Sequence, residues 1–198
     1  MQSYGDGVDL TSITPTPHQM KALTHPVRVR ILGLLRIDGP ATATTLASRL
    51  GLNTGATSYH LRQLAQAGFV AEATELGNAR DRWWQAAHRV TTTDTAGPAE
   101  PEARATLDAY LQSVVVVTTE RLQRSVEELP LLPEEWRDAT TYSDWVVQLT
   151  PRKARAVIEQ LIEAIKEIGD EEDDDEAAPY VLQLNAFPYP GKVGSQEP

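Results

Sequence analysis

Polar and cationic side chains that can hydrogen-bond to another molecule recur between residues 53 and 66. On a helix they share one face, and no acidic residue lies among them: Gly55, Ser58, Tyr59, Arg62 and Gln66. Thr57, Leu61 and Leu64 fall on the opposite face and form a narrow core stripe. A short helix of this kind fits the major groove of DNA, which is about 12 Å wide. The alternative is an ordinary helical hairpin with a polar outer face.

Two helices and a tight turn are expected to position that face. Leu46 and Leu50 share one side of a first helix, and Gly51 stands where a helix end favours a left-handed backbone. Asn53 then offers a side-chain oxygen as the N-cap of the second helix, which ends near Ala67. The pattern predicts a helix-turn-helix, although such patterns also occur in proteins that bind no DNA.

Length and composition set the protein class. A chain of 198 residues forms one large domain or two small ones. The absence of cysteine excludes disulfides, thiolate zinc sites and thiol redox chemistry, and it suits a reducing compartment. No apolar run approaches the roughly 20 residues that span a bilayer, and the N-terminus has no secretory pattern. We therefore expect a cytoplasmic protein without a membrane partner.

The charge is distributed unevenly along the chain. The net charge is −10, yet residues 17–90 hold nine Lys or Arg against four Asp or Glu, which gives +5. Residues 91–198 hold nine bases and 22 acids, which gives −13. The first part can attract phosphate while the second repels it.

Several further elements are expected around the helix-turn-helix. Residues 1–16 are interpreted as a flexible arm, and residues 27–36 as a helix with an apolar face. Two short strands, at 69–73 and 82–86, enclose the turn signal Gly77-Asn78. Arg80 and Arg82 lie at and just beyond that turn, so the hairpin is a ribbon with a basic tip, a wing. Residues 17–90 are thus predicted to be a winged helix-turn-helix DNA-binding domain.

Three segments in the right order resemble the ArsR-type winged-helix regulators. Residues 22–35, which begin Ala22-Leu-Thr-His-Pro, look like the first helix of that family. Residues 57–70, beginning Thr57-Ser-Tyr-His-Leu, resemble its recognition helix, and Gly77-Asn-Ala-Arg-Asp-Arg-Trp-Trp is similar to its wing. The resemblance covers about residues 18–88.

The resemblance implies a homodimeric transcription factor that binds a palindromic operator in double-stranded DNA. It also implies that Thr54, Gly55, Ser58 and Tyr59 approach base edges and that basic wing residues approach the backbone. From its position one turn further along the helix, Arg62 has the reach for a phosphate. The alternative for Arg80 and Arg82 is that they are solvated turn charges.

Residues 91–101 are a linker by composition, and 102–129 are predicted to be one long helix. Its apolar stripe is the predicted dimerisation surface: Leu107, Tyr110, Leu111, Val114, Val117 and Leu122. So wide a stripe needs a partner, because helices are stabilised mainly by packing. The resemblance suggests a second subunit, and the alternative is the chain's own C-terminal part.

Residues 102–198 are expected to combine this helix with a small acidic unit. A strand at 141–149, a helix capped by Thr150 and ended by Gly169, and a strand at 180–187 follow in order. Residues 170–176 are all acidic and predict a disordered connection. The fold class is therefore mainly α with small β, an α+β chain, and the C-terminal unit is where a small-molecule or protein effector is expected.

Catalytic and metal-binding patterns are absent from the sequence. There is no phosphate-binding loop, no nucleophile motif and no pair of histidines at zinc spacing. Many ArsR-like proteins sense metals through a cysteine pair or through Asp and His on the dimer helix. This chain lacks cysteine, and residues 102–129 lack histidine. We expect no enzyme, no cofactor and no metal, but a DNA-binding repressor rather than an activator. The alternative is an interaction module that kept the winged-helix shape and lost operator binding.

Overall fold

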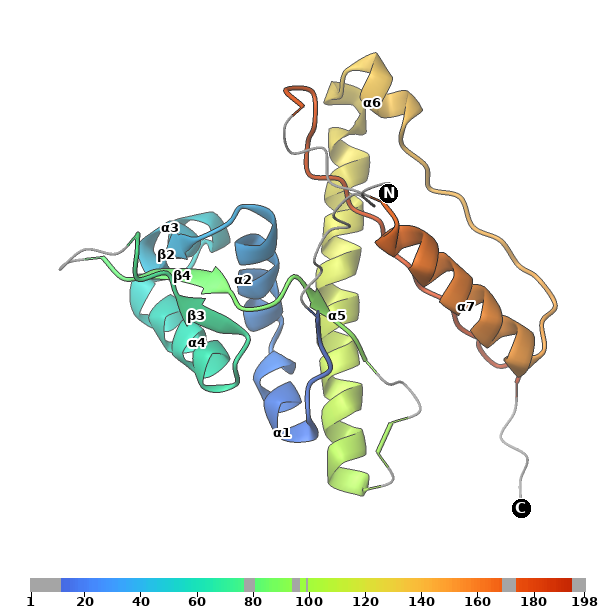
Figure 1. Cartoon of the computed structure of the whole chain (residues 1–198), viewed down its shortest axis with the longest axis horizontal. Coiled ribbons are helices and arrows are strands. Elements are labelled where there is room, and N and C mark those ends of the chain that lie inside the picture. Colours follow the sequence, from blue (N-terminus) through green and yellow to red (C-terminus); the bar gives the residue numbers. More distant parts are fainter. Residues whose placement is uncertain (1–11, 77–80, 94–96, 99, 169–173, 194–198) are drawn as a thin grey trace, which may run out of the picture. The chain divides into compact units, whose positions relative to one another are not determined.

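The structure is a computed structural model that describes residues 12–76, 81–93, 97–98, 100–168 and 174–193. It divides into two compact units, of which one comprises Leu10–Tyr142 and the other begins at Ser143. Each unit is described by itself, and both can be followed by colour in Figure 1.

The first unit opens with a series of short helices. Their bounds are α1 Pro17–Met20, the 3-10 turn η1 Lys21–Leu23, α2 Pro26–Ile37, α3 Ala43–Leu50 and α4 Thr54–Gln66. Thr42 caps α3 through its hydroxyl, which accepts from the Thr45 amide at 3.1 Å. Gly51 ends α3 with a φ of 64°, a left-handed conformation that glycine adopts at little cost. The predicted helix-turn-helix is therefore present as α3 and α4.

A three-stranded antiparallel sheet completes the winged fold. Strand β3 (Val70–Glu72) pairs with β4 (Trp83–Ala86), as the two predicted wing strands should. A third strand that sequence reasoning missed, β2 (Ala41–Thr42), covers the other side of β4. Trp84 is buried and Trp83 only half-buried, because successive side chains of a strand point to opposite faces. The predicted turn Gly77-Asn78 and Arg80 lie outside the described residues.

The end of the predicted flexible arm is ordered. Strand β1 (Ser12–Ile13) pairs in parallel with β5 (Val90–Thr91), and the Thr14 and Thr92 hydroxyls lie 2.7 Å apart. Arg36 secures the same region, since it donates to the His88 carbonyl and to the Thr91 hydroxyl at 2.8 Å each. The interpretation of residues 12–16 as a loose arm is therefore wrong. It failed because this pairing joins segments almost eighty residues apart, which leave no local pattern.

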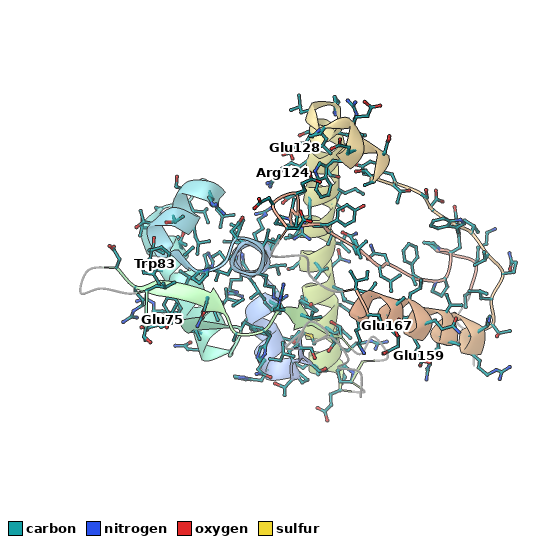
Figure 2. All side chains as sticks on the ribbon, turned by 45° about the horizontal axis from the view of Figure 1, so that its top comes forward. Glu75, Trp83, Arg124, Glu128, Glu159 and Glu167 are labelled. Carbon is teal, nitrogen blue, oxygen red and sulfur yellow. The ribbon has the colours of Figure 1, made fainter. Side chains whose placement is uncertain are left out.

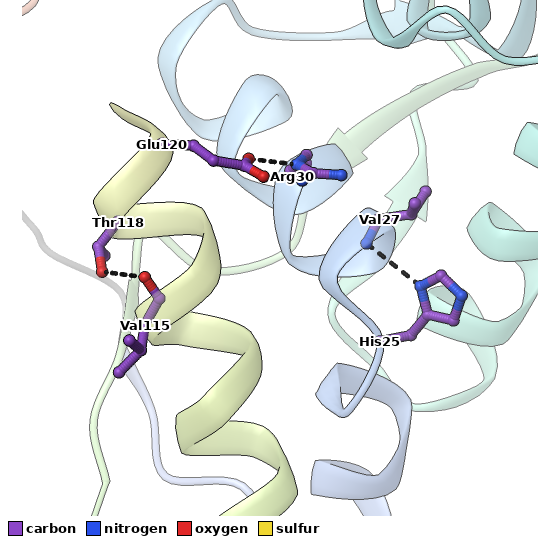
Figure 3. Close-up of polar contacts among 6 residues, drawn as sticks. All are labelled: His25, Val27, Arg30, Val115, Thr118 and Glu120. Carbon is purple, nitrogen blue, oxygen red and sulfur yellow. Dashed lines mark hydrogen bonds and ion pairs between the residues drawn. The ribbon is translucent and has the colours of Figure 1, made fainter. Parts of the chain in front are cut away.

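The long helix α5 (Pro101–Glu128) packs on the winged helix within the first unit, as Figure 1 shows. Leu107 and Tyr110 belong to the same core as Ile31 and Leu61. Arg30 of α2 binds the Glu120 carboxylate through both Nε and Nη2, and the Nε contact is 2.9 Å (Figure 3). The compact unit thus runs past the predicted linker at 91–101 and includes the helix that was expected beyond it.

The C-terminal expectations are met in part. After η2 (Leu129–Leu131) and α6 (Glu134–Asp138), helix α7 runs over Pro151–Lys166 with Thr150 as its N-cap. The strands predicted at 141–149 and 180–187 are wrong, because neither segment pairs with another strand. An alternating pattern shows that a segment suits a sheet, but a strand also needs a neighbour to hydrogen-bond its backbone. The fold class, mainly α with small sheets, is confirmed.

Replacing Leu107 with Ala should lower the free energy of unfolding by about 2–5 kcal/mol, because the side chain is 2% exposed and its loss leaves a cavity between α5 and the winged helix. Urea unfolding followed by circular dichroism measures the change. Leu76→Ala is the matched control, since Leu76 is 48% exposed and should change stability by no more than about 0.5 kcal/mol. Equal losses for the two variants would show that α5 is not part of this core.

Candidate nucleic-acid interface

The two faces of α4 are separated as the sequence predicts. Thr57, Leu61 and Leu64 are each 0% exposed, and the Thr57 hydroxyl donates to the Asn53 carbonyl at 3.1 Å. The predicted contact residues lie on the outer side, where Ser58 is half-buried and the others are exposed: Asn53, Thr54, Gly55, Tyr59 and Arg62. Burying one stripe of the helix therefore presents the other to solvent.

A groove of about 310 Å³ lies between α4, the start of α3 and strand β4 with the residues just before it. It is lined by Thr54, Ser58 and Arg62 of α4 and by Arg82 beside the wing. Four of the predicted DNA-binding residues are thus brought together from two separate elements. Hydroxyl and guanidinium groups are the donors that phosphate oxygens accept from.

Sequence reasoning missed three other polar residues in this groove. Thr42 and Thr44 contribute hydroxyls from the start of α3, and Asp81 contributes a carboxylate next to Arg82. The threonines were considered only as helix caps, and Thr42 is indeed the cap of α3. A threonine at a helix start beside a recognition helix is the signal that could have identified them, because helix N-termini also attract phosphate.

Arg62 is the cation that the structure leaves most accessible. Among the described Lys and Arg residues of 17–90, it alone makes no hydrogen bond, ion pair or ring contact within the chain. Arg82 is held in place instead: its Nε lies 3.2 Å from the Glu72 carboxylate, and its guanidinium carbon lies 5.8 Å from the centre of a Trp84 ring. Arg62 is thus free to bind a phosphate, and Arg82 is preorganised beside the groove.

Most other cations of this region already have acidic or carbonyl partners. Arg30 pairs with Glu120, Arg49 pairs with Asp38, and the Lys21 ammonium lies 2.8 Å from the Glu102 carboxylate. Two of these acids belong to α5, which the sequence placed in the anionic part of the chain. The net charge of +5 therefore overstates the positive charge that a ligand of the winged helix would meet.

Asn53 and Gly55 have structural roles at the start of α4. The Asn53 side-chain oxygen accepts the Ala56 amide at 2.8 Å, as predicted for an N-cap. A side chain at position 55 would place its Cβ 3.3 Å from that same oxygen. A glycine at position 55 thus leaves the cap undisturbed and keeps the helix start low enough for close approach by a ligand.

Tyr59 does not line the groove, but it is 51% exposed beside a small aromatic cluster. Its ring packs edge-on against His60, whose ring centre lies 4.9 Å from that of His25. His25 itself caps α2 by accepting the Val27 amide at its Nδ1 (Figure 3). The buried Nδ1 of His60 has no hydrogen-bond partner in the described part of the chain. Burial, and then the nearby His25 and Arg28, lower the pKa of His60 below its ordinary value of 6.5.

Comparison with known families bears directly on this region. Residues 23–73, which span α2 to β3, match a family model described as a helix-turn-helix domain. The chain carries a helix-turn-helix domain. This domain points to a DNA-binding regulator rather than to an enzyme. No curated protein matches the chain.

The predicted dimerisation residues are divided between two environments on α5. Leu107, Tyr110 and Val117 are at most 7% exposed, and Leu107 and Tyr110 pack in the core of their own chain. Leu111 and Val114 are half-buried against that core, whereas Leu122 is 49% exposed. Much of the predicted stripe is thus occupied within the subunit. Helical periodicity shows that a side chain is apolar on one face, but not whether its own chain or another one covers it.

Within the described ranges, no three His, Asp or Glu side chains come together in a way that could hold a metal ion. None of the described helices is both long and apolar enough to cross a membrane.

Acidification should destabilise the protein through His60. Because its pKa is lowered in the folded state, the unfolded chain takes up the proton first as the pH falls through 6.5, and stability drops until the folded pKa is passed. Melting temperatures measured between pH 7.5 and pH 5.5 should therefore fall more steeply for the natural chain than for His60→Gln. His18→Gln is the control and should keep the natural slope. Identical slopes for all three proteins would contradict this assignment.

Proposed function

We propose that this protein is an ArsR-type transcriptional repressor that binds a palindromic operator as a homodimer. The observation that carries the proposal is the groove in which Thr54, Ser58, Arg62 and Arg82 converge, inside a region that matches a helix-turn-helix domain. Hydroxyl and guanidinium donors gathered along an exposed helix start are suited to a DNA backbone and to base edges in the major groove.

The proposed contacts differ in what they read. Thr54, Gly55, Ser58 and Tyr59 face base edges and set the choice of sequence, whereas Arg62 binds a phosphate. The wing, with Arg82 at its base and Arg80 nearer its tip, lies along the adjacent backbone. Occupying the operator excludes other proteins from the same DNA, which is why repression is the proposed outcome.

A second row on α5 supports the homodimer. Val115, Leu122 and Val126 lie seven and four residues apart, and each is about half exposed. Thr118 lies between them, and its hydroxyl donates to the Val114 carbonyl at 2.9 Å and the Val115 carbonyl at 3.1 Å (Figure 3). No free polar group therefore interrupts the row. Exposed apolar side chains at this spacing suit a helix of a second subunit, which would place the two recognition helices one turn of DNA apart, about 34 Å.

Replacing Arg62 with Gln should weaken binding to all DNA sequences and reduce the slope of log affinity against log salt by about one, because one phosphate contact is lost. Ser58→Ala should instead cost about 1–3 kcal/mol on the operator and little on unrelated DNA. Fluorescence anisotropy with DNA from the region upstream of the protein's own gene measures both. Arg49→Gln is the matched control, because Arg49 is paired with Asp38 and lies outside the groove.

If the natural chain binds no DNA below micromolar concentration, the interaction-module alternative gains support. The large share of winged-helix cations already paired within the chain is the observation that favours it. Retention of an unchanged salt slope in Arg62→Gln would specifically remove Arg62 from the interface.

Leu122→Glu should convert the dimer to a monomer, because it places a charge in the middle of the exposed α5 row. Light scattering after size exclusion measures the mass, and operator affinity should fall in the same variant. Leu131→Glu is the control, since Leu131 is 81% exposed and lies beyond the helix. A monomeric natural chain, or a Leu122→Glu protein with unchanged mass, is the outcome that would exclude this interface.

A further inference from the structure

The unit that begins at Ser143 has no buried core of its own. None of its described side chains is buried, and the apolar face of α7 is the most regular surface that it presents. The spacing along that face alternates between four and three residues: Ala154, Ile158, Leu161, Ile165 and Ile168. Leu161 is 44% and Ile168 54% exposed. This is the spacing at which two helices pack side by side over their whole length.

The charges of α7 are sorted along its axis. Arg152, Lys153 and Arg155 occupy the first turns, whereas Glu159, Glu163 and Glu167 follow. Lys166, the exception, lies 2.7 Å from Glu163 and is neutralised within the helix. The side chains of the three N-terminal cations make no contact with any described residue, and neither do those of Glu159 and Glu167, which Figure 2 labels on α7.

We propose that α7 binds α7 of a second copy of this chain in an antiparallel pair centred on Leu161. In that arrangement Leu161 meets Leu161, and Ala154 meets Ile168 of the other copy. The cationic start of each helix then lies beside the anionic end of its partner, and the two helix dipoles are opposed. One surface serves both copies, as a two-fold axis requires.

The same charges disfavour other occupants. Helices that lie on membranes carry Lys and Arg along their polar face, whereas here Glu159, Glu163 and Glu167 occupy it. The acidic residues 170–176 follow in sequence, so nucleic acid is repelled as well. A parallel pair would bring like charges together at both ends. A second, antiparallel copy is the occupant that matches both the apolar spacing and the sorted charges.

This contact is separate from the dimer proposed through α5. The two surfaces lie on different helices and share no residue, so each is tested by its own variants. Leu122→Glu leaves the α7 pair untouched, and variants of α7 leave the α5 row untouched.

Cysteine cross-linking in the full-length chain tests the geometry, because the natural sequence contains no cysteine. Under mild oxidation Leu161→Cys should form a covalent dimer rapidly, whereas Ala154→Cys or Ile168→Cys alone should not. An equimolar mixture of Ala154→Cys and Ile168→Cys should form the mixed dimer at a rate comparable to that of Leu161→Cys. Each variant is first shown by circular dichroism to keep the natural helix content.

Rapid self-linking of Ala154→Cys would overturn the proposal, since only a parallel or unspecific contact brings two such positions together. The absence of covalent dimer in every variant would also overturn it, and would mean that the rest of the same chain or another partner covers α7.

A charge exchange gives a second, independent test. Arg155→Glu and Glu167→Lys should each slow the cross-linking of Leu161→Cys several-fold, because each places like charges opposite one another. The double variant should restore the natural rate, since the pair is complementary again with its charges exchanged. Additive slowing in the double variant would contradict the antiparallel arrangement.

Discussion

The fold depends on the burial of one side of α4. Thr57, Leu61 and Leu64 are fully covered, so the helix cannot rotate about its axis without exposing apolar side chains to water. That constraint fixes which residues face outward, and the caps at Asn53 and Gly51 fix where the helix starts relative to α3. The wing adds a further support, because Trp84 packs in the same core while Arg82 remains at the edge of the groove. The polar face is thus a consequence of packing beneath it.

Local signals made much of this predictable. The α4 stripe, the Asn53 cap, the Gly51 helix end and the two wing strands each depend on residues within about ten positions of one another. The pairings of β1 with β5 and of β2 with β4 were not predictable, because two-residue strands carry no periodicity and their partners lie far away in sequence. The strands predicted at 141–149 and 180–187 failed for the opposite reason: the pattern was present, but the partner was not.

The candidate site shows the same limit. Thr54, Ser58, Arg62 and Arg82 were identified from residue type and position, whereas Thr42, Thr44 and Asp81 became visible only once three elements met at one groove. The sum of charges was also an incomplete guide. Ion pairs such as Arg30 with Glu120 consume part of the positive charge that the sequence assigns to the winged helix, and they do so with acids from α5. Which cations stay available is decided by tertiary contacts.

The two ion pairs between the winged helix and α5 have a mechanical consequence. Glu102 and Glu120 are eighteen residues apart on one helix, which at 1.5 Å per residue separates the two attachment points by about 27 Å. A rod fastened at two distant points cannot pivot about either of them. Any tilt of α5 therefore turns the whole reading head with it, and a few degrees at the helix axis become a displacement of several ångströms at α4.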